Sequence, residues 1–198
     1  ALARRYESLV ARARNTEQAL GGNGEFAQIV AKVYFKLLSY KDEYEVARLH
    51  SRKDFLDSIR REFGHGAKLR FHLAPPMLNA GTDARGRPRK TRFGSWMLPV
   101  FRILSRLKGL RGTAFDIFGH SADRRLEKEL IVEFERLLDR VLPELTVGNL
   151  ASATELFGLF MNIRGYGPVK EEATNRVRQQ IAKRMQNMDS ASVDARIV

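Results

Sequence analysis

The stretch that decides the fold runs from Tyr34 to Leu49 and reads YFKLLSYKDEYEVARL. Its first half completes an apolar stripe that recurs every three or four residues, as on one face of a helix. The stripe consists of Phe26, Ile29, Val30, Val33, Tyr34, Leu37 and Leu38. The second half of the stretch is dense in charge, and no turn residue separates the two halves. The sequence therefore predicts a buried helix that continues through Lys41–His50 into a charged interface.

The charged half of the stretch contains Lys41, Asp42, Glu43, Glu45 and Arg48. Carboxylates that are buried together can share a proton and act in acid–base catalysis. Lys41 and Glu45, however, are spaced i,i+4, and Glu45 and Arg48 are spaced i,i+3, so opposite charges can pair along the helix. We interpret these five residues as a structural ion-pair motif and favour that interpretation over catalysis.

Apolar residues at helical spacing also mark the segments 2–20, 52–63, 96–107, 121–142, 150–161 and the region after Pro168. Lys68–Leu73 instead alternates apolar and polar residues, which indicates a half-buried strand, and Arg89–Phe93 is the expected return strand. The predicted fold class is mainly α: an irregular multi-helix bundle of about seven helices with one small β-hairpin near residues 68–93. We expect a single accessory domain over residues 1–186, followed by a polar tail at 187–198.

The chain contains no cysteine, which excludes iron–sulfur ligation, disulfides and a cysteine nucleophile within these 198 residues. The four histidines lack the spacing of metal ligands, so we expect no metal site; they are His50, His65, His72 and His120. The longest apolar runs are far shorter than the ~20 residues that span a bilayer, and the N-terminus does not read as a signal peptide. We expect a cytoplasmic protein that does not associate with membranes. Because the sequence starts without Met and inside an amphipathic pattern, we also expect a part of a longer polypeptide.

The net charge is +12, a balance that favours anionic partners, although the basic residues are spread along several segments. The densest basic run consists of Arg85, Arg87, Arg89, Lys90 and Arg92. Alternate Arg residues on an extended strand point the same way and can clamp a phosphate or carboxylate. The alternatives are pairing with acids of the same chain or enzyme, which we favour, then a ligand or protein partner, and last nucleic acid.

A second candidate anion site is the segment IRGYGPVKE at Ile163–Glu171, a glycine-bracketed turn that opens a helix. The N-terminus of that helix, assisted by Arg164, can attract an anion. Alternatively, the segment is a turn in which Gly165 and Gly167 supply positive φ angles. We favour the turn, and keep Arg164 among the candidate anion- or partner-binding residues.

Several blocks along the chain carry a family resemblance. They are the opening stretch at Tyr34–Leu49, FHLAPP at Phe71–Pro76, GRPRK at Gly86–Lys90, FGSWM at Phe93–Met97, LKGLRGTAFDIFG at Leu107–Gly119, and IRGYGPVKE. In this order they resemble the C-terminal domain of the long, fused indolepyruvate ferredoxin oxidoreductases. The resemblance covers about Arg4 to Gln180.

What the resemblance implies concerns the parent enzyme more than this chain. Such 2-oxoacid oxidoreductases decarboxylate an aryl pyruvate on thiamine diphosphate, pass electrons through iron–sulfur clusters to ferredoxin, and transfer the acyl group to coenzyme A. The thiamine-binding motif and the cluster cysteines are absent from this sequence, so no catalytic residue is carried over. We expect no cofactor in the chain, and the resemblance implies other domains of the parent oxidoreductase, and ferredoxin, as partners.

The main hypothesis is therefore a non-catalytic C-terminal module that serves domain packing or partner docking. The alternative is a free-standing basic module that binds nucleic acid or another anionic ligand. The signatures of the common RNA-binding modules are missing, so nucleic acid is the less favoured partner. A third hypothesis, a small-molecule enzyme, would require a deep pocket lined by acids with perturbed pKa values.

Overall fold

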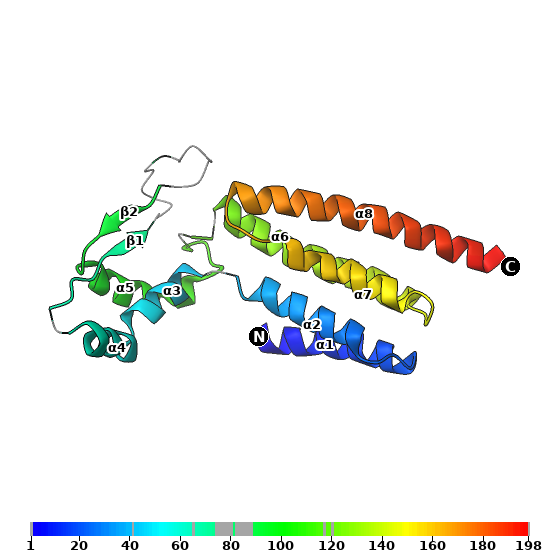
Figure 1. The fold of residues 1–198 in the computed structure, drawn as a ribbon, viewed down its shortest axis with the longest axis horizontal. Helices are drawn as coiled ribbons and strands as arrows, with labels where there is room; N and C mark the ends of the chain where they lie inside the picture. Colours follow the sequence, from blue (N-terminus) through cyan, green and yellow to red (C-terminus); the bar gives the residue numbers. More distant parts are fainter. Residues whose placement is uncertain are drawn as a thin grey trace. The chain divides into compact units, whose positions relative to one another are not determined.

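The computed structural model describes residues 2–40, 42–64, 66–73, 81, 89–116, 118–119 and 121–197, with side chains described as far as Met188. The structure is mostly helical, at 73%, and the described residues include eight α-helices and one two-stranded antiparallel sheet (Figure 1). The prediction of a mainly α fold with a small β-hairpin is confirmed.

By its internal contacts the chain divides into two compact units, where a single domain over residues 1–186 was expected. The bundle unit comprises Ala1–Tyr40 and Leu126–Val198, and the basic unit comprises Lys41–Arg125. The last helix, α8, runs from Pro168 to Ile197 and so extends through the segment expected to be a polar tail.

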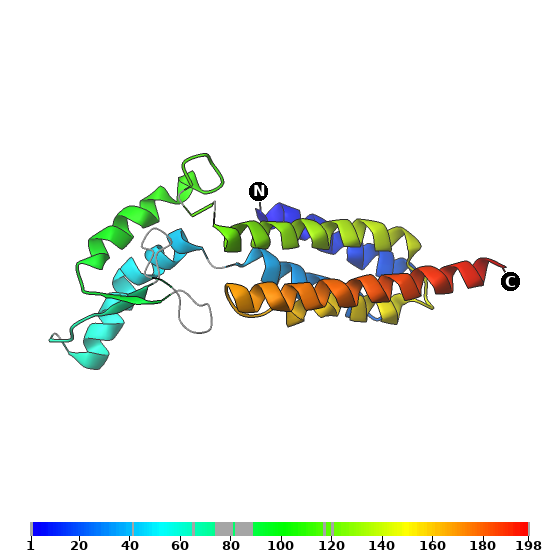
Figure 2. The same cartoon turned by 90° about the horizontal axis from the view of Figure 1, so that it is seen from above.

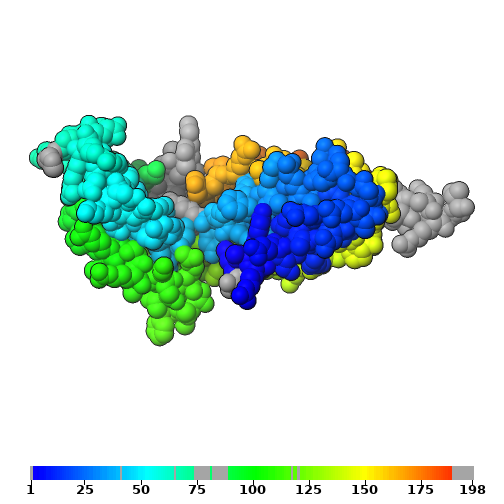
Figure 3. All heavy atoms as spheres, turned by 90° about the horizontal axis from the view of Figure 1, so that it is seen from below, coloured from blue at the N-terminus to red at the C-terminus, as the bar shows by residue number. Residues whose placement is uncertain are grey.

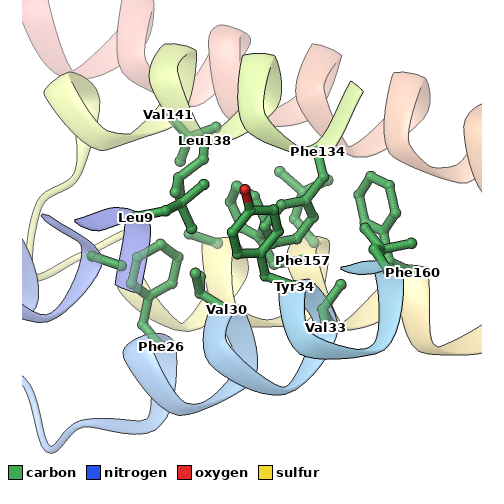
Figure 4. Packing of buried hydrophobic residues seen from close by; sticks show 14 of the residues in the cluster. Leu9, Phe26, Val30, Val33, Tyr34, Phe134, Leu138, Val141, Phe157 and Phe160 are labelled. Carbon is green, nitrogen blue, oxygen red and sulfur yellow. The ribbon is translucent and has the colours of Figure 1, made fainter. Parts of the chain in front are cut away.

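The bundle unit consists of helices that run along a common direction (Figures 1 and 2). They are α1 (Leu2–Ala19), α2 (Glu25–Leu38), α6 (Ala122–Val141), α7 (Leu150–Gly158) and α8, with short 3-10 helices η2 (Leu142–Glu144) and η3 (Leu159–Asn162). The predicted stripe on α2 supplies the centre of the core, in which Phe26, Val30, Val33 and Tyr34 are fully buried. Phe134 packs edge to face against both Phe157 and Phe160 in the same core (Figure 4).

Two charged side chains form hydrogen bonds with backbone groups at the ends of helices in the bundle. The Glu17 carboxylate is buried and accepts hydrogen bonds from the backbone N–H groups of Gly24, Phe26 and Ala27, at 2.8–3.1 Å. It thereby satisfies N–H groups at the start of α2 that have no partner within the helix. The Lys36 ammonium donates to the carbonyl oxygens of Phe160, Met161 and Ile163 at 2.8–3.0 Å and so caps the end of η3. Burial, together with the charges of Arg164 and Lys170, lowers the pKa of Lys36.

The basic unit is built on a second, smaller core. Its elements are α3 (Glu43–Ser51), α4 (Lys53–Phe63), β1 (Phe71–Leu73), β2 (Thr91–Phe93), α5 (Met97–Arg106) and η1 (Leu107–Leu110). The buried core residues are Ala47, Phe71, Met97 and Phe101, so α3, α5 and the hairpin meet there. The register pairs Phe71 with Phe93 on one face of the hairpin and His72 with Arg92 on the other.

The stretch Tyr34–Leu49 is not one continuous helix, and this prediction was wrong. α2 ends at Leu38, and a new helix, α3, begins at Glu43. Asp42 has an extended backbone conformation, and its carboxylate accepts hydrogen bonds from the N–H groups of Tyr44 and Glu45. An N-cap of this kind starts a helix and competes with continuation of the one before it. The two compact units meet in sequence at this break, between Tyr40 and Lys41.

Candidate anion-binding and docking surface

The positive charge of the chain is concentrated in the basic unit. Residues 41–125 contain 19 Lys and Arg against 9 Asp and Glu, a net charge of +10, whereas the rest of the chain contains 16 against 14. The excess of positive charge therefore lies in one contiguous segment of the chain, which folds as one compact unit. A net charge of this size attracts acidic partners and speeds their encounter.

Three acids at the start of α3 are bound to arginines of the same unit. Asp42, besides capping α3, forms an ion pair with Arg111. Glu43 forms an ion pair with Arg124, whose side chain is buried. Glu45 and Arg48 pair on the exposed surface through two hydrogen bonds of 2.8 and 2.5 Å, which lower the pKa of Glu45. These contacts place Asp42, Glu43, Glu45 and Arg48 in structural ion pairs; Lys41 lies outside the described residues.

A fourth acid, Asp116, holds the loop after η1 against α3. Its buried carboxylate accepts hydrogen bonds from the Tyr44 hydroxyl at 3.1 Å and from the N–H groups of Gly112 and Phe118 at 2.9 and 3.3 Å. Burial alone would raise the pKa of Asp116, but these three donors outweigh it and lower the pKa. Burial and the neighbouring Asp116 also raise the pKa of Tyr44.

Because these four acids are occupied in this way, they are not available to neutralise the exposed cations of the unit. Ten exposed cations of the unit form no ion pair with any other described residue. They are Lys53, Arg61, Lys68, Arg70, Arg89, Lys90, Arg92, Arg102, Arg106 and Lys108. The structure thus provides a cationic surface that its own acids do not neutralise.

The predicted basic run belongs in part to this surface. Arg89, Lys90 and Arg92 are exposed, and Arg92 lies directly opposite the exposed His72 across the hairpin. Arg85 and Arg87 lie outside the described residues. The structure brings Arg70 to the same hairpin, two residues before His72, and the sequence analysis had not singled out Arg70.

Arg164, the remaining candidate, belongs to the bundle unit. Its Nε donates to the carbonyl oxygen of Met161 at 3.2 Å, so this atom serves the end of η3. Gly165 and Gly167 have φ angles of 101° and 55°. A Cβ on Gly165 would lie 2.8 Å from Val169 Cγ1, which explains the glycine there. The local geometry therefore supports the turn interpretation of IRGYGPVKE.

The described residues offer little to a metal ion or a small substrate. Within them, no three His, Asp or Glu side chains gather in a way that could hold a metal. An open hollow of about 610 Å³ lies between α3 and α4, lined by Val46, Leu49, His50 and Phe55, and its one acid, Asp54, is bound by Arg52. The hydrogen bonds from Arg52 lower the pKa of Asp54, the opposite of what a general acid needs. None of the helices, as far as they are described, combines the length and apolar character needed to cross a bilayer.

Comparison with known proteins identifies a family without assigning an activity. Residues 1–183 match the model of a family described as a family of unknown function, DUF6537. No curated protein and no solved structure matches the chain. Since the match extends over most of the 198 residues, the chain belongs to the DUF6537 family.

Proposed function

We propose that this chain is a non-catalytic helical module of a thiamine-diphosphate-dependent 2-oxoacid ferredoxin oxidoreductase of the indolepyruvate type, and that its basic unit docks an acidic protein surface. The resemblance of the sequence blocks from Tyr34–Leu49 to Ile163–Glu171 supports the choice of enzyme. In this proposal thiamine diphosphate, the iron–sulfur clusters and coenzyme A belong to other parts of the parent enzyme, which is cytoplasmic.

The observation that carries the docking role is the uneven distribution of charge. The basic unit has a net charge of +10, and its acids at the start of α3 are occupied by Arg111, Arg124 and Arg48. Ten exposed cations remain, and they produce a field that steers an acidic protein and accelerates its association at low salt. An acidic neighbouring domain and the acidic surface of ferredoxin both have the required chemistry.

The test uses the parent oxidoreductase with Arg89, Lys90 and Arg92 all changed to Gln. At low ionic strength we expect the rate of ferredoxin reduction to fall by about tenfold or more, because electrostatic steering raises on-rates by about 10–10³. Reduction of a neutral redox dye, which needs no docking, is expected to keep its wild-type rate. If the partner is instead a neighbouring domain, the domains of the variant separate on size-exclusion chromatography.

The matched control changes three exposed cations of the bundle unit, Lys32, Lys128 and Arg136, to Gln. This control removes the same charge and should leave both rates and the domain association unchanged. The docking role is wrong if the hairpin variant reduces ferredoxin at the wild-type rate and its domains stay together, or if the control loses as much activity as the hairpin variant.

Nucleic-acid binding is the second candidate, because the same concentration of cations would also attract a phosphate backbone. A titration of the chain with single-stranded RNA and DNA over a range of salt concentrations separates the two candidates. Nucleic acid would be favoured if the logarithm of the association constant falls steeply and linearly with the logarithm of the salt concentration. The chain should then also bind the nucleic acid more tightly than it binds an acidic protein.

A further inference from the structure

Helix α5 carries a second stripe of apolar side chains on the side that faces solvent. Its buried side, with Met97 and Phe101, packs on the small core of the basic unit. On its outer side Trp96, Pro99, Ile103 and Leu107 follow one another at intervals of three, four and four residues, so they lie on one face of the helix. Figure 3 shows the segment around α5 and η1, in green, at the surface.

This outer stripe is large and exposed for a soluble protein. Trp96 is 62% exposed and Ile103 is 59% exposed, and both lie within two turns of the same helix. Single exposed apolar residues are common, but an aligned row that includes a Trp is typical of an interaction site. Trp96 packs edge to face against Phe93 of β2, whereas the core of the unit is supplied by the other side of α5, with Met97 and Phe101.

Cations border the outer stripe. Arg102 and Arg106 are exposed, lie one turn apart on α5, and flank the stripe beside Ile103. Neither forms an ion pair with a described residue, and both belong to the unit with a net charge of +10. An apolar centre with an arginine border is the arrangement found at protein interfaces, where Trp and Arg are enriched.

We propose that the α5 stripe, formed by Trp96, Pro99, Ile103 and Leu107 and bordered by Arg102 and Arg106, binds an acidic amphipathic segment of a partner protein. This inference rests on the proposed docking function and specifies its partner. Apolar side chains of the partner cover Trp96 and Ile103, and its carboxylates pair with the two arginines.

The aliphatic part of the stripe decides between a protein partner and nucleic acid. A base can stack on Trp96, but Ile103 and Leu107 offer neither a stacking plane nor a hydrogen bond to a base. Burying them requires aliphatic or aromatic groups on the partner, which a helix with an apolar face provides. An acidic amphipathic helix satisfies both the apolar row and the arginine border.

The test uses the full chain, in which Trp96 is the single tryptophan, so intrinsic fluorescence reports directly on the stripe. Two designed helical peptides are titrated: one with a Leu face flanked by Glu, and one with the same Leu face flanked by Gln. A single-stranded oligonucleotide is the third probe. We expect the Glu peptide to shift the Trp96 emission to shorter wavelength and to bind at least about tenfold more tightly than the Gln peptide.

A pair of double variants locates the binding site. Arg102→Gln with Arg106→Gln should weaken binding of the Glu peptide by about tenfold, equivalent to about 1.4 kcal/mol. The control, Lys53→Gln with Arg61→Gln on α4, removes the same charge from exposed positions and should change the affinity less than about twofold.

Several results would overturn the proposal: no shift in emission with the Glu peptide, equal affinity for the two peptides, or equal weakening by the two double variants. A stronger response to the oligonucleotide would assign the surface to nucleic acid. A shift that depends on chain concentration alone would assign it to self-association. Since the titration needs neither ferredoxin nor the parent enzyme, its result is independent of the activity test of the proposed function.

Discussion

The two units of this chain use charge in opposite ways. In the bundle unit, arginines and lysines pair with acids on other helices, as in Arg5–Glu135, Arg12–Asp139, Lys170–Glu127 and Arg178–Glu133. In the basic unit, three acids at the start of α3 are paired, Asp54 and Asp57 pair with nearby arginines, and ten exposed cations form no ion pair with a described residue. Nearly balanced charge accompanies helix packing in the first unit, whereas the second unit carries most of the excess positive charge.

The hydrophobic cores of the two units also differ, in size. The bundle unit buries a long row of aromatic and aliphatic side chains along α2, α6 and α7, whereas the basic unit buries a small cluster around Phe71 and Phe101. Stability measured on the chain should therefore depend most on the bundle, and binding should depend most on the basic unit. Variants in each unit test this division.

The largest effect is expected in the core of the bundle. Leu37→Ala removes a side chain that is 3% exposed and should lower the free energy of unfolding by about 2–5 kcal/mol, through lost burial and the cavity left behind. Denaturant unfolding followed by circular dichroism measures the change. Phe35→Ala, on the same helix but 62% exposed, is the control and should cost much less. If both variants lose the same free energy of unfolding, then the division of α2 into a buried face and an exposed face is wrong.

The next effect concerns the junction between α1 and α2. Glu17→Gln replaces one acceptor oxygen by an NH₂ group that cannot accept from the N–H groups of Gly24, Phe26 or Ala27. We expect the free energy of unfolding to fall by about 1–3 kcal/mol, the cost of a buried donor left without a partner. Glu7→Gln, at an exposed position of α1, should leave unfolding unchanged. Equal stability of the two variants would contradict this account of the junction.

A third comparison separates two ion pairs of the charged motif. Glu43→Gln leaves the buried guanidinium of Arg124 without its carboxylate and should cost about 1–3 kcal/mol. Glu45→Gln breaks a pair on the exposed surface, and the melting temperature should barely change. Melting curves of both variants measure the difference. The ranking is wrong if the Glu45 variant melts at the lower temperature.

The smallest effect is a shift in acid sensitivity. The pKa of Asp116 is lowered in the folded chain, so its ionised form stabilises the fold above the ordinary Asp value of about 4, and this contribution is lost as the pH falls through the lowered pKa. Tyr44→Phe removes one donor to Asp116 and should raise that pKa, moving acid unfolding to higher pH. The control is Tyr6→Phe, because the Tyr6 hydroxyl donates to a backbone carbonyl. Coinciding acid-unfolding curves of Tyr44→Phe and the unmodified chain would contradict the role of this hydrogen bond.

Periodicity in the sequence was enough to predict most of the elements. The stripe from Phe26 to Leu38 became the core face of α2, and the alternation of Leu69, Phe71 and Leu73 marked the strand of the hairpin. Each of these signals is local, since it depends on neighbours within one or two turns, and local spacing determines which side chains share a face.

The helix boundaries near the charged motif could not be predicted in the same way. Asp42 was interpreted as a helical charge, yet it caps α3, because the same carboxylate can do either and no Gly or Pro marks the break. Ser51, although a residue type that often caps a helix N-terminus, is the last residue of α3, and its hydroxyl donates to the Arg48 carbonyl.

Local spacing also could not predict which residues form ion pairs with the acids of the charged motif. The sequence pointed to pairs three or four residues apart, and Glu45–Arg48 is such a pair. Asp42 and Glu43 instead pair with Arg111 and Arg124, which lie 69 and 81 residues further along the chain. The fold brings these residues together. The basic run at Arg85–Arg92 could be recognised in the sequence, but which acids are occupied by ion pairs could be seen only in three dimensions.

One measurement tests most directly whether the basic unit is the docking unit. A carbodiimide cross-linker joins lysine amines to carboxylates at zero length, so it records where an acidic partner lies on the chain. The full chain is cross-linked to the Glu peptide at low salt, and the sites are mapped by mass spectrometry. The account predicts cross-links on lysines of the basic unit, at Lys68, Lys90 and Lys108, with Lys108 the strongest because it adjoins the α5 stripe. Equal cross-linking of the exposed bundle lysines Lys32, Lys128 and Lys183 would contradict it.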